Sequence, residues 1–387
     1  MMLVALVASS QIAGAAEVRI IPGETLYLNA TNPGRNYNDL VVHSIVIASG
    51  PGETFTVNGM RIDLFSKGVA VLSKNIAPAV LVGETRGMGQ MVAQGMGVFL
   101  NAQILSEDGL TGLFGRELNL SGSPAMGQNE ALMLTRQHFS LDFVPDELKV
   151  TVYGELASGK SETLSARAGV EIHKSPITYS APLKGMWLMT SLPSIQSHHR
   201  LNPPTEFARD FFKTDAEGRI KNGDALKAEN YYGYGASVMA AAEGKVVFVI
   251  SDEVQDRAAY LPKPGETPRQ AGNRIGRYNM QRYAGDFARA AAGNIVVIRH
   301  EQEGVTEYSS YGHLKAGSVR VAVGDLVARG EVIAEVGDTG DSAAVHLHFQ
   351  VNAEENVFMS KSLPALLVDL KSPMRGIDPG RFMQKSK

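Results

Sequence analysis

The hydrophobic residues of the first half of the chain fall in short runs separated by turn residues. Such runs occupy 25–28, 40–47, 55–57 and 68–72, and two alternating runs follow at 149–153 and 166–172. Strands of this length, punctuated by turn signals, are typical of β-sandwiches and barrels. The sequence therefore predicts an N-terminal β-sandwich-like domain over residues 17–175.

The second half repeats the pattern of short apolar runs joined by glycine-bearing turns. The runs cover 244–250, 295–300, 306–311, 319–323, 332–336 and 346–352. Because little room is left for crossover helices, this signature predicts antiparallel hairpins. We expect a second, two-sheet antiparallel β domain over 176–387, which makes the predicted fold class all-β. A charged, proline-bearing insert at 252–292 is expected to be a surface loop beside a substrate groove, with a short helix around 276–292.

Residues 1–16 combine an apolar stretch with small residues at its end, as a secretory signal peptide does. The usual basic start is missing, so a short buried strand is the alternative. No other stretch approaches the roughly 20 apolar residues that cross a bilayer. We expect an exported protein, periplasmic or extracellular at the cell wall, with no stable membrane span after signal removal.

Composition narrows the possible chemistry. The chain has 387 residues, 44% of them hydrophobic and 20% charged, and a net charge of −3. The charge is spread without a basic block, which argues against a nucleic-acid partner. The chain has no cysteine, so disulfides and thiolate metal ligands are excluded. A zinc site here must use His, Asp or Glu.

The segment 154–161, GELASGKS, satisfies the phosphate-loop pattern. A working phosphate loop needs a helix after it, so that backbone N–H groups converge on the phosphates. The residues that follow alternate like a strand, so we expect a hairpin turn and no bound nucleotide.

His346 and His348 flank Leu347 in a strand-like run, and alternation places both imidazoles on one face. Each histidine alone could be a half-buried residue bonded to backbone. Other candidates lie upstream, His313 in a Tyr-Gly-His-Leu segment and Asp210 before two phenylalanines. A His pair at 198–199 precedes them. Separated His, Asp and His residues are the donors that a catalytic zinc takes while leaving one position for water.

Six segments, in order along the C-terminal half, carry a resemblance to a known family: 235–247, 293–300, 311–314, 323–325, 336–342 and 346–349. Together they resemble the lysostaphin-like (LytM-type) zinc metallopeptidases. The resemblance implies that His348 binds zinc, while His313 and His346 stay unligated and handle protons beside the bound water. It also implies a substrate, the peptide cross-links of peptidoglycan.

The first histidine and the aspartate depart from the family spacing, because His199 and Asp210 are separated by ten residues that include two prolines. We expect His199 and Asp210 to complete the zinc site, since three protein ligands are required. His199 is preferred over His198 because longer-spaced members share a His-Arg arrangement. Glu206 is a possible substitute ligand.

Further residues have weaker signals. Tyr311 could offer a hydroxyl to the site or be a strand aromatic, and His300 is expected to be structural. Arg200 and Arg209 could support the ligands, contact a substrate carboxylate or be solvated. Three histidines of the first domain are expected to be ordinary and without partners: His43, His138 and His173.

The sequence thus predicts an exported metalloendopeptidase that hydrolyses peptidoglycan peptides with zinc-activated water, using Zn²⁺ as cofactor. The first domain would bind the wall, position the substrate or occlude the groove. One alternative is a catalytically inactive relative that binds the wall or activates another hydrolase. A second is a carbohydrate-binding β-protein with incidental histidines.

Overall fold

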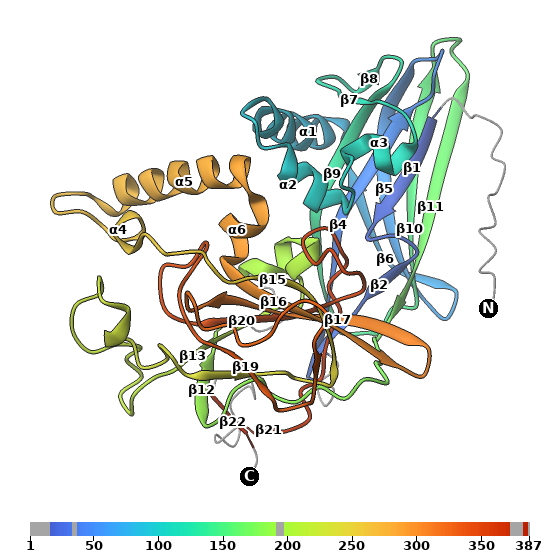
Figure 1. The fold of residues 1–387 in the computed structure, drawn as a ribbon. Coiled ribbons are helices and arrows are strands. Elements are labelled where there is room, and N and C mark those ends of the chain that lie inside the picture. The colour runs from blue at the N-terminus through green and yellow to red at the C-terminus, as the bar shows by residue number, and fades with distance from the viewer. Residues whose placement is uncertain (1–15, 33–36, 191–196, 372–381, 386–387) are drawn as a thin grey trace.

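The computed structural model describes residues 16–32, 37–190, 197–371 and 382–385 (Figure 1). Apart from Ala16, the expected signal peptide lies outside the described residues. Strands predominate over helices, which confirms the predicted β class. In the described ranges no helix is long and apolar enough to cross a membrane.

The N-terminal half forms two sheets. The first has the order β1 (Ala16–Ile21), β4 (Tyr37–Ser49), β9 (Glu130–Leu141) and β7 (Asn119–Leu120), with β3 (Asn29–Asn32) paired to β4. The second has the order β2 (Thr25–Tyr27), β11 (Ser161–Glu171), β10 (Glu147–Leu156), β5 (Phe55–Ser66) and β6 (Val69–Ile76), with β8 (Ala125–Met126) paired to β5. One buried cluster draws on both sheets, as the sandwich prediction requires.

Residues 45–48 of strand β4 are apolar on both faces of the sheet, which explains why this part of the sequence does not alternate. Ile45 and Ile47 belong to the core between the two sheets, whereas Val46 and Ala48 pack under three helices. These helices are α1 (Pro78–Ala93), α2 (Gly97–Ile104) and α3 (Gly109–Phe114). The sequence analysis did not predict these helices. An apolar strand run shows that both of its faces are buried, but not whether a sheet or helices cover the second face.

The hairpin prediction at 154–161 is confirmed. Strands β10 and β11 pair antiparallel up to Glu155 and Ser161, and the Leu156 N–H donates to the Lys160 carbonyl at 2.9 Å. Gly159 takes a positive φ of 80° in the turn. The motif is followed by strand β11 and not by a helix, so backbone N–H groups of the motif bond across the β10–β11 hairpin instead of converging on a phosphate.

The C-terminal half is built on one long antiparallel sheet and a short one. The long sheet has the order β18 (Leu326–Val327), β15 (Gly244–Ile250), β16 (Asn294–Gln302), β17 (Val305–Leu314), β20 (Leu347–Asn352), β13 (Arg209–Phe212), β12 (Met186–Met189), β22 (Phe382–Lys385) and β21 (Leu370–Lys371). The short sheet pairs β14 (Ser237–Met239) with β19 (Val332–Glu335). The predicted two-sheet antiparallel arrangement is therefore confirmed.

One predicted strand of this half is wrong. Residues 319–323 form no strand, and β18 comes just after them. Val319 and Val321 still pack against the core as partly buried residues. Their alternation reflects this packing and not a sheet ladder.

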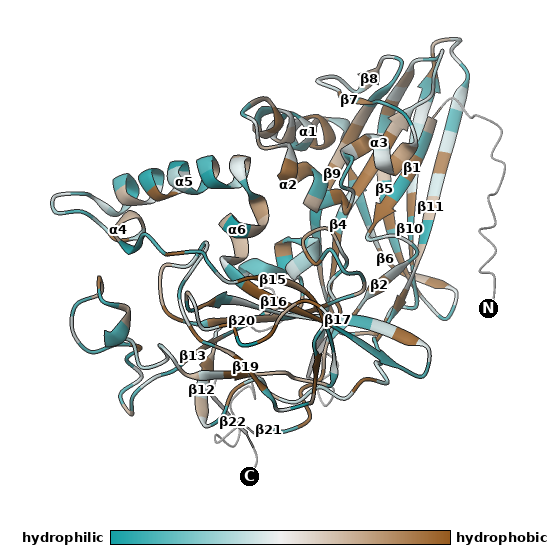
Figure 2. Cartoon of the chain, viewed as in Figure 1, coloured by the Kyte–Doolittle hydropathy of each residue, from teal (hydrophilic) through white to brown (hydrophobic). Residues whose placement is uncertain are grey.

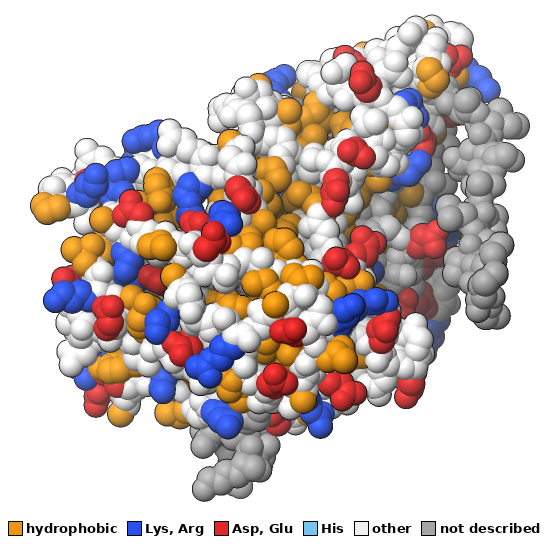
Figure 3. All heavy atoms as spheres, in the orientation of Figure 1, with side chains coloured by type: hydrophobic (Ala, Val, Ile, Leu, Met, Phe, Trp, Pro, Cys, Tyr) orange, Lys and Arg blue, Asp and Glu red, His pale blue; other side chains and the backbone are white. Residues whose placement is uncertain are grey.

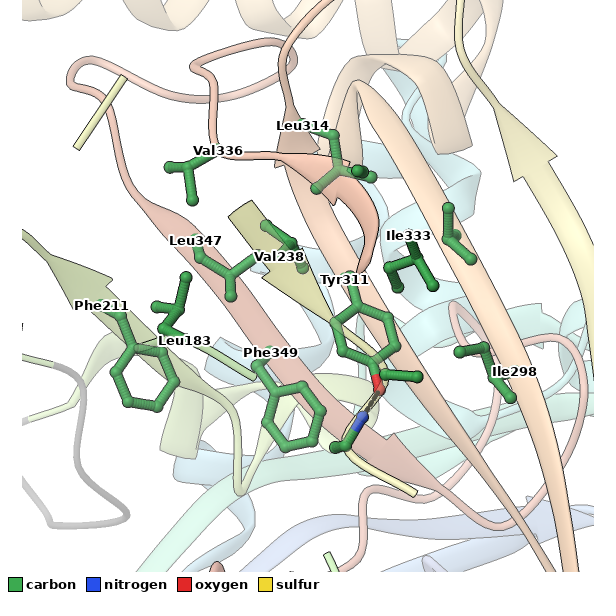
Figure 4. Packing of buried hydrophobic residues seen from close by; sticks show 14 of the residues in the cluster. Leu183, Phe211, Val238, Ile298, Tyr311, Leu314, Ile333, Val336, Leu347 and Phe349 are labelled. Atoms are coloured by element: carbon green, nitrogen blue, oxygen red, sulfur yellow. Dashed lines mark hydrogen bonds between the residues drawn. The ribbon is translucent and has the colours of Figure 1, made fainter. Parts of the chain in front are cut away.

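The core of the C-terminal half lies between its two sheets (Figure 4). Tyr311, Leu347 and Phe349 point from the long sheet into this core, where Val238 and Ile333 of the short sheet meet them. The Tyr311 hydroxyl accepts a hydrogen bond from the backbone N–H of Ala241 at 2.7 Å. Of the two interpretations of Tyr311, the strand aromatic is correct.

The insert is more helical than predicted. It contains α4 (Arg257–Tyr260), α5 (Pro268–Gly285) and α6 (Phe287–Ala292). Helix α5 begins earlier than 276, because Thr267 and Gln270 form a capping box and Pro268 occupies the first turn. In Figure 2, α5 is largely hydrophilic along its length, as a helix with much of its surface in solvent should be.

Candidate metal and catalytic site

Strand β20 separates core residues from site residues by alternation. Leu347 and Phe349 point into the core, so His348 faces the opposite side of the sheet. Across the ladder, His348 pairs with Asp210 of β13 on one side and with Gly312 of β17 on the other. Residues far apart in the sequence therefore meet on one face.

Asp210 lies between two of the predicted ligands. Its Oδ2 is 2.9 Å from the Nε2 of His199, and its Oδ1 is 3.1 Å from the Nδ1 of His348. The His199 and His348 rings are 4.9 Å apart. His199 belongs to a 3₁₀ turn, η1 (His198–Leu201), so the unusual spacing to Asp210 is bridged by a turn and not by a strand. Two imidazole nitrogens and a carboxylate oxygen form a donor set that suits zinc.

His198 is the neighbouring candidate. Its ring is 3.9 Å from that of His199, and the ligand atoms of His198, His199 and Asp210 lie within 4.8 Å of one another. The two differ in environment, because His198 is exposed whereas His199 is buried and bonded to Asp210. This contrast favours His199.

Glu206, the possible substitute ligand, is engaged elsewhere. Its carboxylate accepts from Arg200 and lies 2.8 Å from the Nε2 of His43. The structure therefore gives Glu206 a different task from Asp210.

Gln350 was not singled out by the sequence, yet it orients His348. Its amide nitrogen donates to the Pro204 carbonyl at 3.1 Å and to the Asn352 side-chain oxygen at 2.8 Å. Its oxygen is therefore the acceptor for the Nε2–H of His348 at 2.7 Å. With Nε2 engaged by Gln350, Nδ1 is the nitrogen of His348 that faces Asp210 and is available to a metal. Bonds of this kind hold histidine ligands in orientation around metals.

His313 and His346 share one arrangement. The Nδ1 of His313 lies 2.7 Å from the Thr339 carbonyl, and that of His346 lies 2.8 Å from the Ala344 carbonyl. A carbonyl can only accept, so each Nδ1 carries the proton and each Nε2 keeps a lone pair. The Nε2 of His346 is 3.7 Å from the Asp210 carboxylate. The ring centroids of His313 and His346 are 4.5 Å apart.

Alternation alone would not bring His313 to this face. Tyr311 points into the core, and simple alternation would send His313 the same way. His313 instead has a positive φ of 59°, a conformation that costs energy outside glycine and concentrates at functional sites. The ring of Phe212 stacks on that of His346, with centroids 4.8 Å apart, and so helps to hold His346 in place.

Burial sets the charge states of the site. Burial lowers the pKa of His199 to about 4 although Asp210 opposes the shift, and it also lowers the pKa values of His313 and His346. Burial would raise the pKa of Asp210, but His199 and His348 hold it well below its usual range. Burial also opposes protonation of His348, yet its hydrogen bond to Asp210 leaves the His348 pKa raised. Near neutral pH, Asp210 is therefore an anion, whereas His199, His313 and His346 are neutral imidazoles.

The site opens into a cleft of about 600 Å³ with walls from both halves of the chain. Figure 3 shows hydrophobic side chains gathered near the centre of this face, between α5–α6 and the N-terminal helices α1–α2. The apolar lining comes from Met88 and Met91 of α1, Phe99 of α2, Phe287 of α6 and Phe358. The N-terminal contribution to the cleft was not predicted, because these residues are distant from the motifs.

One cation lines this cleft. Arg136 of β9 is the only Arg or Lys among the described residues of the lining. It is exposed and has a positive φ of 53°. It lies on the wall contributed by the N-terminal half, where Met88, Met91 and Phe99 also line the cleft.

The remaining predicted residues are structural. Arg209 is half-buried, donates to the Ala365 carbonyl, and has a pKa lowered by desolvation to about 10. His300 lies 2.7 Å from both the Glu243 carbonyl and the Ser309 hydroxyl, as a supporting residue should.

The expectation that the N-terminal histidines have no partners is wrong. His43 is bonded to Glu206, and His173 lies 3.0 Å from Glu307. His138 lies 3.9 Å from Asp39. Two of the three partners lie in the C-terminal half, which the sequence of the first half could not reveal.

Comparison with known proteins bears on this geometry. Residues 281–359 match the model of peptidase family M23. This match confirms the resemblance to the lysostaphin-like metallopeptidases and supports a peptidase. The M23 segment contains His313, His346 and His348, whereas His199 and Asp210 precede it. No curated protein sequence matches the chain.

The solved structures similar to this chain include those of three bacterial proteins. The catalytic domain of lysostaphin from Staphylococcus simulans is 19% identical, covers 48% of this chain and 84% of its own, and has a TM-score of 0.23. Csd3 from Helicobacter pylori is 12% identical over 88% of this chain and 73% of its own, with a TM-score of 0.27. A zinc-containing peptidase from Vibrio cholerae is 13% identical over 85% and 81%, with a TM-score of 0.25.

Proposed function

We propose that this chain is an exported zinc metalloendopeptidase that hydrolyses the peptide cross-links of peptidoglycan. His199, Asp210 and His348 would hold the metal. The observation that carries the proposal is the convergence of these three donors, with Asp210 and His348 on one sheet face, His199 on the adjacent η1 turn, and two further histidines beside them. The M23 segment supports the reaction class, and the family's substrate supplies the expectation of peptidoglycan.

Each histidine has a task that follows from its hydrogen bonds. A bound zinc ion would supply Lewis acidity, which lowers the pKa of a water and polarises a peptide carbonyl. The Nε2 atoms of His346 and His313 carry lone pairs, so they can accept the proton of the attacking water. They can then return it to the leaving amine. Their Nδ1–H bonds to Ala344 and Thr339 keep the rings in position during both transfers.

The cleft suggests how a peptide is held. Its apolar wall would limit water at the reacting carbonyl, which strengthens the polar interactions made there. Arg136 would pair with a carboxylate of the peptide, since guanidinium groups bind carboxylates in a bidentate manner. Peptides with a free carboxylate are therefore the preferred substrate class.

We further propose two domains, 17–175 and 176–387, of which the first lines the cleft. All buried residues of two apolar clusters lie at or before Val170, and those of the other two lie at or after Ile177. Each half thus has its own core, which supports the division. With α1 and α2 beside the histidines, positioning or occluding the substrate fits the first domain better than distant wall anchoring.

The test uses the purified full chain. Elemental analysis should find one zinc per chain, and mass spectrometry of isolated peptidoglycan peptides should show cleaved cross-links. Removal of the metal with a chelator should abolish cleavage, and added zinc should restore it. A chain that binds zinc but cleaves no wall peptide would favour the inactive wall-binding or activating alternative.

A further inference from the structure

A buried network of charged groups joins the N-terminal sandwich to the turn that carries His199. Arg200 is 0% exposed, and its two terminal nitrogens donate to Asp39 of β4 and to Glu206. The other oxygen of Glu206 lies 2.8 Å from the Nε2 of His43, which is also on β4. The network therefore leaves β4, passes through Arg200 and Glu206, and returns to β4.

The turn itself has little to hold it. η1 is four residues long and belongs to no sheet, and a single 3₁₀ turn is only weakly stable alone. Its backbone contacts are local, because the His199 N–H donates to the Ser197 hydroxyl at 3.3 Å and the Asn202 N–H donates to the His199 carbonyl at 3.0 Å. Its orientation must come from side chains that reach outside the turn.

Two adjacent side chains of η1 make those outside contacts. His199 reaches Asp210 on the long sheet of the C-terminal half, while Arg200 reaches Asp39 on the sandwich. Arg200 also lies over the Phe207 ring, 5.0 Å from its centroid. The planar guanidinium can meet two carboxylates at once, which restricts the turn more than a single contact would.

We infer that Asp39, Arg200 and Glu206 are positioning residues that orient His199 for the metal, so that the first domain completes the site in the second. This inference rests on the proposed zinc site. The contacts around a ligand commonly change metal affinity by about 10–100-fold when removed. A buried ion pair that loses one partner also leaves the other charge uncompensated, so the turn should shift when Asp39 is neutralised.

The experiment measures zinc affinity by chelator competition and the absorption spectrum of the cobalt-substituted full chain. We expect Asp39→Asn and Arg200→Met to weaken zinc binding about 10–100-fold and to alter the cobalt spectrum, which reports ligand geometry. Arg200→Lys should bind zinc more tightly than Arg200→Met, since lysine keeps the positive charge but cannot bond two carboxylates with a planar guanidinium. In the Asp39→Asn/Arg200→Met double variant the losses should not add, because both remove the same contact.

Glu307→Gln is the matched control. Glu307 is also a buried carboxylate, and it accepts from His173, Ser175 and Tyr179 without touching η1. The Glu307→Gln variant should have a lower melting temperature, with zinc affinity and the cobalt spectrum unchanged.

If Asp39→Asn and Arg200→Met behave like this control, the inference is overturned while the zinc site stands. If the unaltered chain binds no zinc, the proposed function fails first, and the inference fails with it. Should Arg200→Met not fold, Asp39→Asn decides alone.

Discussion

Strands β4 and β20 are both covered on two faces, but the second faces differ. At 45–48 of β4, Ile47 meets the sandwich core and Val46 meets helices, so both faces are apolar there. In β20, Leu347 faces a core, whereas His348 and Gln350 face the cleft. A buried polar face is stable only where its groups are hydrogen-bonded, and these two side chains are bonded to each other. The difference separates a stretch of strand that serves packing, 45–48 of β4, from a strand end that faces the cleft with side chains able to do chemistry.

The largest expected effect is that of removing the ligand on β20. His348→Ala should weaken zinc binding by more than about 100-fold, since removing a ligand should cost more than removing a supporting contact, and cleavage should fall to background. Ile47→Ala on β4 is the control. It should lower the free energy of unfolding by about 2–5 kcal/mol while zinc content stays at one per chain. Elemental analysis and denaturant titration measure the two effects, and full zinc in His348→Ala would refute the ligand assignment.

Next come the two histidines that would move protons. His313→Ala and His346→Ala should retain zinc and lose about 10²–10⁴-fold in the rate of peptide cleavage. His300→Ala, which removes a buried structural histidine, should lower stability with a much smaller change in kcat. Metal analysis beside steady-state kinetics separates these outcomes. Loss of zinc from both site variants would place these residues among the ligands.

A smaller effect is expected at Gln350. Gln350→Leu removes the acceptor for the Nε2–H of His348, so zinc affinity should drop about 10–100-fold. Gln350→Glu keeps an acceptor and should bind zinc at least as tightly as the unaltered chain. Chelator competition measures both variants. Equal affinities for the leucine and glutamate variants would show that this bond does not tune the ligand.

Arg136 tests the wall of the cleft formed by the N-terminal half. Arg136→Gln should raise KM about tenfold for peptides with a free carboxylate, the loss expected for one charge-assisted hydrogen bond. Amidated versions of the same peptides should show no difference between the two proteins. Steady-state kinetics on the matched peptide pairs gives the answer, and an equal KM increase for both would point to a general disturbance of the cleft.

The smallest effect belongs to the hairpin between β10 and β11. Lys160→Ala should leave zinc content and cleavage unchanged and alter stability by no more than about 0.5 kcal/mol, as for most surface positions. Adding ATP to either protein should have no effect. Cleavage that depended on ATP and on Lys160 would restore the phosphate-loop interpretation.

The sequence by itself determined the predominance of strands, the turn at Lys160 and the shared face of His346 and His348. Each depends on local alternation or turn chemistry, which the neighbouring residues already contain. The resemblance to the metallopeptidase family, with its segments in the same order, identified His313 as a further site residue. The helices α1–α3 were not predicted, because the face that they cover looks the same in sequence as any buried strand face.

Only the tertiary structure decided what surrounds those histidines. It turned His313 toward the cleft through a left-handed backbone, aligned Gln350 behind His348, and gave Arg200 its partner on β4. None of these depends on a local pattern, since Asp39 and Arg200 are 161 residues apart. Such long-range contacts form only when whole sheets pack. The site histidines could therefore be predicted from the sequence, whereas the residues that orient them could not.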